Sequence, residues 1–273
     1  MPGSVITLLS DFGLTDSYVG AMKGVVLGIN PDVQLVDLTH QVSPQDVLQG
    51  AFLLGQACSL FPAGTIHAAV VDPGVGTERR ALLVRGNGHW FLAPDNGLLT
   101  FVLPPERSDS AVFQPYSANV PDGFHAYALT NQRYWRQPVS ATFHGRDIFA
   151  PVAAHISLSV APEELGEPVD RLIRLAVPAP QWQGDILQAH VLAVDRFGNV
   201  VTTVPAEALA GVAGMEVELN GTQVRVLFST YAQGDGLVAL IGSHGYLEVA
   251  LTNGNAADMI GVKVGDELLV RRG

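Results

Sequence analysis

The first half of the chain alternates short apolar runs with segments in which apolar residues recur at helical spacing. Three runs predict buried strands and two periodic segments predict helices between them: 5–9, 33–38 and 65–71 for the strands, 16–29 and 43–61 for the helices. Residues 81–93 (ALLVR-GNG-HWFLA) then predict a hairpin. Because strands separated by helices are typical of parallel sheets, we expect an α/β domain with a mainly parallel sheet over residues 1–165.

The pattern changes in the second half of the chain. Several prolines fall in a stretch of weak periodicity, and we expect a linker over residues 166–183. Beyond it the pattern is strand, turn, strand, and the alternation on both sides of Asn220-Gly221 predicts a hairpin with a type I′ turn. We therefore expect residues 184–273 to form a smaller antiparallel, barrel-like β domain.

The composition narrows the range of partners. The 273 residues carry a formal net charge of −11 without a basic patch, so nucleic acid is not an expected partner. No apolar run approaches the about 18 residues of a membrane-spanning helix, and the N-terminus lacks the basic region of a signal peptide. A single cysteine, Cys58, fits a reducing cytoplasm. Because 48% of the residues are apolar, we expect some apolar surface to be buried between subunits.

Polar residues stand at the ends of the predicted strands, where ligands bind in open α/β sheets. Asp11, Asp37 and Asp72 each follow an apolar run, and His144 lies at a glycine turn that opens a helix. Taken singly, such residues are more often turn or cap residues than catalysts, and we interpret Asp37 as structural. The segment VVDPGVGTERR (70–80) differs, because a glycine turn brings two arginines back towards Asp72.

The sequence lacks the motifs of several common enzyme classes. The chain has no P-loop, no GxGxxG fingerprint, no His-x-x-x-His or Cys-x-x-Cys pair, and no GxSxG elbow. No metal site is expected, although a metal-dependent hydrolase that uses a small set of side chains stays open: Asp11, Asp72, His144 and Asp147. The arginines beside Asp72 and His144 would compete with a metal ion there.

Six separated segments together resemble one family. In chain order, between residues 5 and 271, they are LLSDFGLTDSYVGAMKG, VVDPGVGTERR, APDNGLL, TFHGRDIFAPVAA, DRFGNVVT and SHGYLEVALTNGNAA. The family is that of the S-adenosyl-L-methionine hydroxide adenosyltransferases, hydrolytic relatives of the fluorinase and chlorinase. The resemblance implies an N-terminal α/β domain, a C-terminal β domain, and a homotrimer with active sites between subunits. It also implies that S-adenosylmethionine reacts with water to give adenosine and methionine, without a cofactor.

The resemblance also implies roles for individual residues. Asp72, Arg79 and His144 match a set that holds a water beside the C5′ carbon, and whether Asp72 or His144 takes the proton stays open. The other matches are expected to bind substrate: Asp11 the ribose diol, Phe143 the ribose and sulfonium, Asp195 and Ser243 the methionine, Asn199 and Asn253 the adenine, Tyr231 stacked on the ring, and Tyr246 in the same pocket.

Two departures from the halogenases bear on the reaction. Fluorinase has a serine where this chain has Gly145 and a tyrosine where it has Asp72. An aspartate beside the nucleophile would repel a halide and assist a water, so hydrolysis is expected rather than S-adenosylmethionine-dependent halogenation. The alternative from another class is a sensor that binds S-adenosylmethionine or adenosine with negligible turnover.

Overall fold

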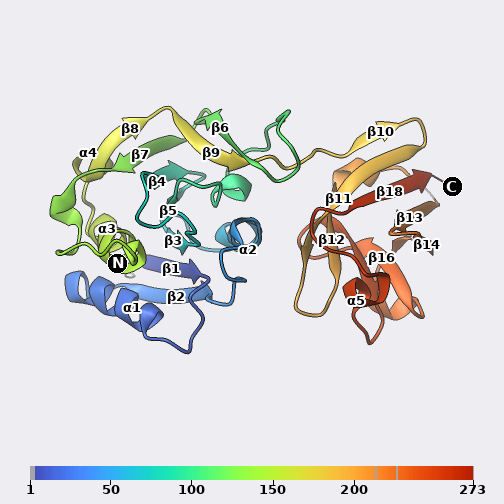
Figure 1. Ribbon diagram of the computed structural model, residues 1–273, viewed down its shortest axis with the longest axis horizontal. Coiled ribbons are helices and arrows are strands. Elements are labelled where there is room, and N and C mark those ends of the chain that lie inside the picture. The colour runs from blue at the N-terminus through green and yellow to red at the C-terminus, as the bar shows by residue number, and fades with distance from the viewer. Residues whose placement is uncertain (1–3, 213, 226, 273) are drawn as a thin grey trace. The chain divides into compact units, whose positions relative to one another are not determined.

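The computed structural model describes residues 4–212, 214–225 and 227–272. The chain divides into two compact units (Figure 1), the N-terminal unit (Met1–Glu106 with Pro115–Leu175) and the C-terminal unit (Arg107–Gln114 with Ala176–Gly273). A mixed sheet with helices on both faces forms the first, and a mainly antiparallel sheet forms the second. Both expected fold classes are confirmed. Over the described ranges, no helix has the length and apolar character needed to cross a membrane.

The sheet of the N-terminal unit has seven strands in the order β2-β1-β3-β5-β4-β7-β8. Their bounds are Val5–Ser10 (β1), Gln34–Thr39 (β2), Ile66–Val70 (β3), Ala81–Gly86 (β4), His89–Pro94 (β5), His125–Leu129 (β7) and Gly166–Val169 (β8). β1 runs parallel to β2 and β3, and β3 runs parallel to β5, whereas β4, β7 and β8 are added antiparallel. The predicted hairpin is confirmed as β4–β5. Since Ser10 pairs with Val70, the carboxyl ends of β1 and β3 lie side by side.

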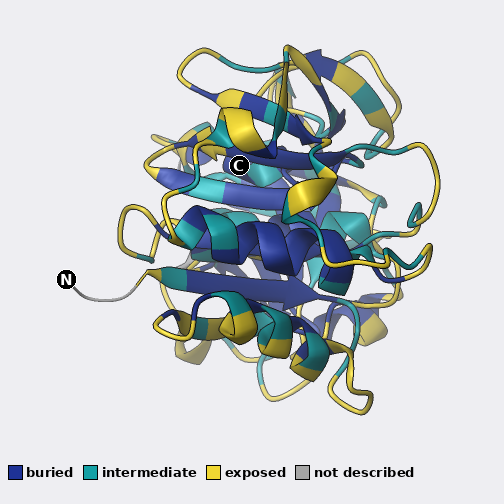
Figure 2. Ribbon diagram, turned by 90° about the vertical axis from the view of Figure 1, so that its left-hand side faces the viewer, coloured by how far each residue is buried: buried dark blue, intermediate teal, exposed yellow. Residues whose placement is uncertain are grey.

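Helices cover both faces of this sheet. Because side chains alternate along a strand, Leu8 points towards α1 (Tyr18–Ile29) and α3 (Ala150–Ser157), while Leu9 points towards α2 (Val47–Cys58) on the opposite face. The central strands β1 and β3 are almost wholly buried, whereas the edge strands β2 and β8 are not. Figure 2 shows buried strands and inward helix sides at the centre, while the loops are largely exposed. The shorter helices of this unit are η1 (Thr100–Val102), η2 (Gln132–Tyr134), η3 (Gly145–Phe149) and α4 (Pro162–Leu165).

Helix α2 begins later than the sequence predicts. We expected Ser43 to cap it, but Asp46 is the cap, and its Oδ1 accepts a hydrogen bond of 2.9 Å from the backbone N–H of Gln49. Gln45 has a φ of 67°, which is left-handed and interrupts any right-handed helix that started at Ser43. The prediction of this helix is confirmed, and its predicted start is wrong.

Residues 166–183, which we expected to form a linker, contain three strands. β8 and β9 (Arg171–Leu175) belong to the N-terminal unit, and β9 pairs with β6 (Pro115–Asn119) in a separate two-stranded sheet. β10 (Gln181–Gln183) pairs with β11 (Ile186–Val194) in the C-terminal unit. Pro168 is tolerated because β8 is an edge strand, where a missing N–H breaks no ladder.

The C-terminal unit contains nine strands in the order β14-β13-β18-β11-β12-β17-β16-β15, with β10 added beside β11. Their bounds are Ile186–Val194 (β11), Val200–Pro205 (β12), Met215–Leu219 (β13), Thr222–Arg225 (β14), Leu227–Phe228 (β15), Leu237–Ile241 (β16), Tyr246–Leu251 (β17) and Glu267–Arg272 (β18). Three short helices lie between them: η4 (Ala206–Leu209), η5 (Tyr231–Gln233) and α5 (Ala256–Ile260). β14 contacts β16, so the sheet curls towards a barrel. The type I′ turn is confirmed, because Asn220 and Gly221 have φ of 48° and 75°.

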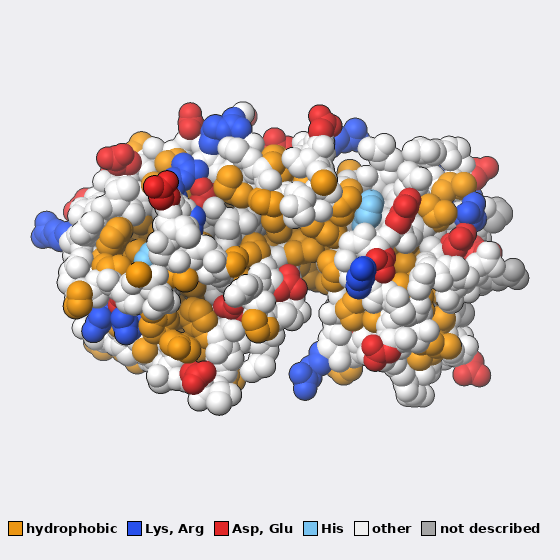
Figure 3. Space-filling view, in the orientation of Figure 1, with side chains coloured by type: hydrophobic (Ala, Val, Ile, Leu, Met, Phe, Trp, Pro, Cys, Tyr) orange, Lys and Arg blue, Asp and Glu red, His pale blue; other side chains and the backbone are white. Residues whose placement is uncertain are grey.

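The charges on the face of the molecule shown in Figure 3 are dispersed. On the face shown in Figure 3, Lys and Arg side chains lie apart from one another and alternate with Asp and Glu. Such a face offers no continuous track for a phosphate backbone. That nucleic acid is not a partner stays a prediction.

Candidate active site

A cavity of about 300 Å³ opens at the carboxyl ends of β1 and β3. All but one of its lining residues belong to three of the segments that resemble the family. The lining residues are Asp11, Phe12, Tyr18, Gln45, Val70, Asp72, Val75, Thr142, Phe143, His144 and Gly145. Four predicted site residues thus lie around one cavity within the N-terminal unit. Its volume is at the lower end of the range for small-molecule sites, which begins at about 300 Å³.

Arg79 holds the carboxylate of Asp72 through two hydrogen bonds. Its Nε donates to Oδ1 at 3.0 Å, and its Nη2 donates to Oδ2. The side chains of Asp72 and Arg79 are only 5% and 10% exposed, so water screens this pair weakly. The guanidinium also lies over the buried ring of Phe149, 5.7 Å from its centroid. A bidentate pair anchored in this way fixes the plane of the carboxylate.

The turn between Asp72 and Arg79 depends on its glycines. Gly76 has a φ of 78°, and a Cβ on it would lie 2.3 Å from the carbonyl oxygen of Ala141. A Cβ on Gly74 would lie 3.4 Å from the Arg79 side chain, an ordinary van der Waals distance. The close approach of the turn to Ala141 therefore depends on Gly76 in particular. This explains how an arginine returns to the strand end.

His144 completes the set, because the same Nη2 atom of Arg79 contacts both Asp72 and His144. It immediately precedes the π-helical turn η3, which continues into α3, so the predicted helix opening is confirmed. Nη2 of Arg79 lies 2.8 Å from its Nδ1. A guanidinium only donates, so Nδ1 accepts, and the neutral ring carries its proton on Nε2. Burial and then the charge of Arg79 lower the pKa of His144, and the charges of Asp72 and Asp147 oppose this in part.

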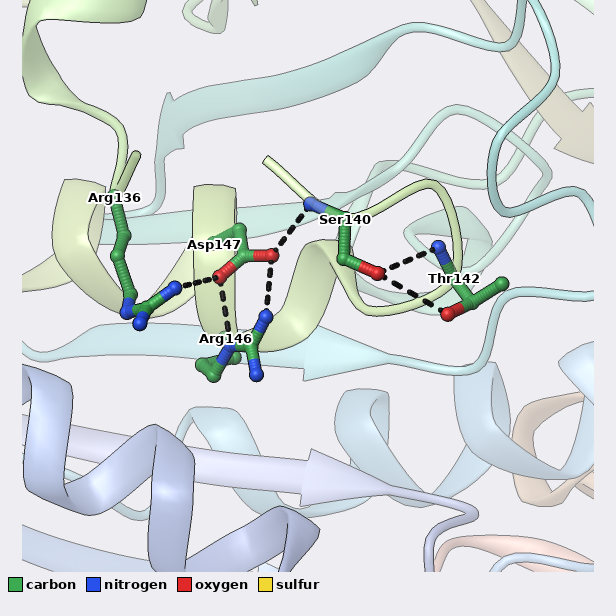
Figure 4. A network of polar contacts seen from close by, with 5 residues as sticks. All are labelled: Arg136, Ser140, Thr142, Arg146 and Asp147. Carbon is green, nitrogen blue, oxygen red and sulfur yellow. Dashed lines mark hydrogen bonds and ion pairs between the residues drawn. The ribbon is translucent and has the colours of Figure 1, made fainter. Parts of the chain in front are cut away.

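Asp147 ties down the segment that leads to His144 (Figure 4). Its side chain is fully buried and accepts hydrogen bonds from Arg146 at 2.7 and 2.8 Å and from the backbone N–H of Ser140 at 2.8 Å. Arg136 adds a contact of 3.3 Å. Burial alone would raise the pKa of Asp147, but these hydrogen bonds and charges outweigh it and lower the pKa. The ionised carboxylate thus holds both ends of the loop from 140 to 147.

Asp11 faces the cavity from the loop after β1. Its Oδ2 accepts a hydrogen bond of 2.8 Å from the backbone N–H of Gln45. Beside it, the ring of Phe143 packs edge-on against Phe12 and Tyr18, with centroids 5.7 and 5.1 Å apart. Phe12 and Tyr18 were not among the predicted site residues, although both stand in the first of the six segments that resemble the family. Aromatic residues close to Asp11 were the signal that could have found them.

Gly145 marks a closely packed part of the wall. A Cβ at this position would lie 3.2 Å from Sδ of Met22 and 3.2 Å from a ring carbon of Phe12. Both distances are shorter than an ordinary van der Waals contact, so a serine here would push Phe12 or Met22 aside. The position at which fluorinase is expected to have a serine is therefore fitted to glycine in this chain.

The remaining predicted substrate-binding residues belong to the C-terminal unit. Oδ1 of Asp195 accepts hydrogen bonds from the backbone N–H groups of Phe197 and Asn199 at 2.8 and 2.9 Å, and Oδ2 accepts one from Nδ2 of Asn199 at 2.9 Å. Three of the about four acceptor positions of this carboxylate are thus used within its own turn. Ser243 and Asn253 are exposed in the turns after β16 and β17. Their contacts with substrate stay predictions.

Tyr231 is joined to a buried carboxylate that the sequence analysis did not identify. Its hydroxyl donates to Oε1 of Glu248 at 2.7 Å, which together with burial and the charges of Glu248 and Asp195 raises the pKa of Tyr231 to about 12. Glu248 is 3% exposed, and its Oε2 lies 2.9 Å from Nε2 of His244. The backbone N–H of Tyr246 donates to Nδ1 of that histidine. Glu248 therefore links Tyr231 with the turn after β16.

Two of the three carboxylates considered for a metal are directed at arginines. Asp72 is paired with Arg79, and Asp147 is paired with Arg146 and Arg136. Among the residues that the structure describes, no group of three or more His, Cys, Asp or Glu side chains is placed to hold a metal ion.

Comparison with known proteins matches both halves of the chain. Residues 6–166 match the family of the SAM hydroxide adenosyltransferase N-terminal domain, and residues 189–269 match that of the C-terminal domain. An (R)-S-adenosyl-L-methionine hydrolase of Salinispora tropica is 40% identical, over 100% of this chain and 99% of the relative. One of Thermus thermophilus is also 40% identical, over 95% and 96%. A fluorinase of Nocardia brasiliensis is 27% identical, over 98% and 97%.

Two solved structures share the fold. A conserved protein from Thermotoga maritima is similar with a TM-score of 0.85 and 32% identity, over 98% of this chain and 100% of that chain. A conserved hypothetical protein from Thermus thermophilus has a TM-score of 0.75 and 36% identity, over 99% and 100%. With its N-terminal and C-terminal parts both matched, this chain belongs to the SAM hydroxide adenosyltransferase family.

Proposed function

We propose that this protein hydrolyses S-adenosyl-L-methionine to adenosine and L-methionine. Family membership supports this reaction, as do the two relatives, 40% identical over nearly their whole length, that are named (R)-S-adenosyl-L-methionine hydrolases. The observation that carries the proposal is that Asp72, Arg79 and His144 meet at the edge of one cavity. The leaving group is a neutral thioether, so the proposed reaction requires no cofactor.

The proposed chemistry is an in-line displacement at C5′. The water oxygen forms a bond to C5′ while the C5′–S bond breaks and its electron pair goes to sulfur. The positive sulfonium thereby becomes the neutral thioether of methionine, which leaves without a proton. One proton is released, and it comes from the water. The enzyme therefore has to hold the water in line and accept that proton.

In this proposal Asp72 accepts the proton. Arg79 occupies Nδ1 of His144, so the ring offers an Nε2–H donor rather than a free base. We assign this donor to the water oxygen, so that the oxygen lone pair is turned towards C5′. Arg79 keeps Asp72 and His144 in place before the reaction begins, which avoids reorganisation in the transition state.

The other cavity residues are assigned to substrate binding. A carboxylate suits the two hydroxyls of a ribose, and we assign this role to Asp11. The rings of Phe12, Tyr18 and Phe143 offer apolar and π surface to the sulfonium, a cation that aromatic rings attract. This attraction disappears as the sulfonium loses its charge, which favours release of methionine.

We further propose a homotrimer in which neighbouring subunits complete each site, as the family resemblance implies. The division of the expected residues supports this, since Asp11 and Asp72 lie in the N-terminal unit while Asp195 and Ser243 lie in the C-terminal unit. Mixing inactive Asp72→Ala and Asp195→Ala proteins should restore part of the activity after subunit exchange. No recovery despite proven exchange would contradict a shared site. We propose a cytoplasmic location, supported by the single free thiol of Cys58.

Product analysis tests the proposed reaction. The purified protein, incubated with S-adenosylmethionine and a chelator, should give adenosine and methionine in equal amounts by chromatography. A halogenated nucleoside formed with chloride or fluoride would indicate a halogenase, and product formed only with an added divalent ion would indicate a metal-dependent hydrolase. Tight binding by calorimetry with no adenosine formed would indicate a sensor.

A further inference from the structure

A buried histidine outside the cavity joins the end of β2 to the loop that carries Asp11. His40 directly follows β2 and is 3% exposed. Its Nδ1 lies 2.7 Å from Oγ of Ser10, and its backbone carbonyl accepts a hydrogen bond of 2.8 Å from the N–H of Gly13. Ser10 and Gly13 flank Asp11 and Phe12, so His40 contacts both ends of this loop, one through its side chain and the other through its backbone.

The other side of the His40 ring is held by Asp37. Its Oδ1 lies 3.1 Å from Nε2 of His40, a close contact without hydrogen-bond alignment. Lys23 contacts Oδ2 of Asp37 at 2.6 Å. Burial alone would raise the pKa of Asp37, but hydrogen bonds and charges from Lys23 and His40 outweigh it and lower the pKa. The carboxylate that contacts the imidazole of His40 is thus ionised.

The contacts have one consistent direction. The backbone N–H of Phe12 donates to Oγ of Ser10 at 3.3 Å, which leaves the Ser10 hydroxyl free to donate to Nδ1 of His40. The ring proton then sits on Nε2, 3.1 Å from Oδ1 of Asp37 but not aligned with it as a hydrogen bond. The Ser10–His40 contact is buried, so breaking it would leave a buried hydroxyl and a buried ring nitrogen without this partner, which favours the observed arrangement of the loop.

We propose that His40, backed by Asp37, is a positioning residue that keeps the loop from Ser10 to Gly13 in the shape that binds the nucleoside. The inference rests on the proposed function, since it assigns Asp11 and Phe12 to the substrate. Asp11 has a second anchor in the backbone N–H of Gln45, so His40 tunes the loop and does not hold it alone. Ser10 is fully buried, which excludes it as a nucleophile in this Ser–His–Asp arrangement.

The chain offers a matched control on the same strand. His67 is fully buried, and its Nδ1 lies 2.7 Å from Oγ1 of Thr7, three residues before Ser10 on β1. His40→Phe and His67→Phe each remove one buried histidine–hydroxyl contact and keep a ring of similar size. Only the first contact touches the Asp11 loop. Both variants should therefore lose stability, but only His40→Phe should lose affinity for adenosine.

The experiment measures adenosine affinity by calorimetry and, separately, KM and kcat for S-adenosylmethionine. We expect His40→Phe to weaken adenosine binding and raise KM about tenfold, with kcat changed less than about threefold, because the loss of one buried hydrogen bond is worth about this much. His67→Phe should leave both values within about twofold of the wild type. Ser10→Ala, which removes only the hydroxyl, should also raise KM. It provides the test if His40→Phe fails to fold.

Unchanged adenosine affinity in Ser10→Ala, or in a folded His40→Phe, would overturn the positioning role. An equal loss in His67→Phe would also overturn it, since the effect would then be general destabilisation. The calorimetric result does not depend on turnover. Failure of the proposed hydrolysis would show in the wild type as adenosine binding without product, and so would be distinguished from failure of this inference.

Discussion

Nη2 of Arg79 lies 2.8 Å from Nδ1 of His144, while the same guanidinium holds both oxygens of Asp72. One cation thus orients a carboxylate and an imidazole at once. Because a guanidinium only donates, this contact fixes the neutral imidazole as a donor at Nε2, which is the reason the proposed mechanism assigns the proton to Asp72. The division of roles proposed for the water follows from this relationship.

Replacing Asp72 by Asn should lower kcat strongly and leave KM little changed. The substitution keeps the shape and removes the charge that accepts the proton, and general bases typically contribute about 10²- to 10⁴-fold. Asp95→Asn is a matched control, because Asp95 pairs with the neighbouring Arg80 at 2.9 Å and does not line the cavity. Steady-state kinetics of both variants check this.

The same variant tests the discrimination against halide. With the charge at Asp72 removed, chloride should be repelled less, and traces of 5′-chloro-5′-deoxyadenosine should form at high chloride concentration. Mass spectrometry detects this product. If Asp72→Asn keeps nearly full turnover, the aspartate is a turn residue paired with Arg79, and the proposed mechanism is wrong.

The pH dependence of kcat/KM should report the ionisation of His144. Burial and then the charge of Arg79 lower the pKa of His144 below 6.5, although the charges of Asp72 and Asp147 oppose this shift. The ring therefore stays neutral down to a pH lower than 6.5. Protonation would place a second proton on Nδ1, facing the Arg79 donor, so the charged ring would lose the contact that orients it, and activity should fall as the pH drops through this lowered pKa. The acid limb of the profile should therefore lie below pH 6.5. In His144→Gln, whose amide donates without titrating, that limb should be absent; a limb at or above 6.5 in the wild type would contradict the assignment.

Asp147→Asn should destabilise the protein and lower kcat. The fully buried carboxylate accepts charged hydrogen bonds from Arg146, so its loss should reduce the free energy of unfolding by about 2–3 kcal/mol. Turnover should fall as well, because the loop that carries His144 loosens. Urea denaturation and kinetics measure the two effects. Glu218→Gln, which breaks the more exposed pair with Arg271, should cost less than about 1 kcal/mol and leave kcat unchanged.

His67 should make stability depend on pH. Burial, followed by the neighbouring charge of His89, lowers the pKa of His67 from 6.5 to about 4. Between these values the unfolded chain binds a proton that the folded protein does not. The free energy of unfolding should therefore be highest above pH 6.5 and fall by up to about 3 kcal/mol as the pH is lowered to about 4. Denaturant titrations across this range should show a smaller pH dependence in His67→Phe; an equal dependence in both proteins would place the effect elsewhere.

Local patterns in the sequence determined the two fold classes, the β4–β5 hairpin and the turn at Asn220-Gly221. These features depend on contacts between near neighbours and on backbone preferences that each residue carries with it. Asp11, Asp72 and His144 could also be predicted to share a site. The first two follow strands of one parallel sheet, whose carboxyl ends meet at one edge.

Only the tertiary structure decided how the side chains face one another. Arg79 and His144 are 65 residues apart, and nothing in either segment indicates that Nδ1, rather than Nε2, meets the guanidinium. Asp37, which we interpreted as structural from the sequence, proves to back His40 against Ser10. Periodicity reports which face of an element is buried, but a hydrogen bond needs a donor and an acceptor within about 3 Å, and that distance is set by the packing of distant segments.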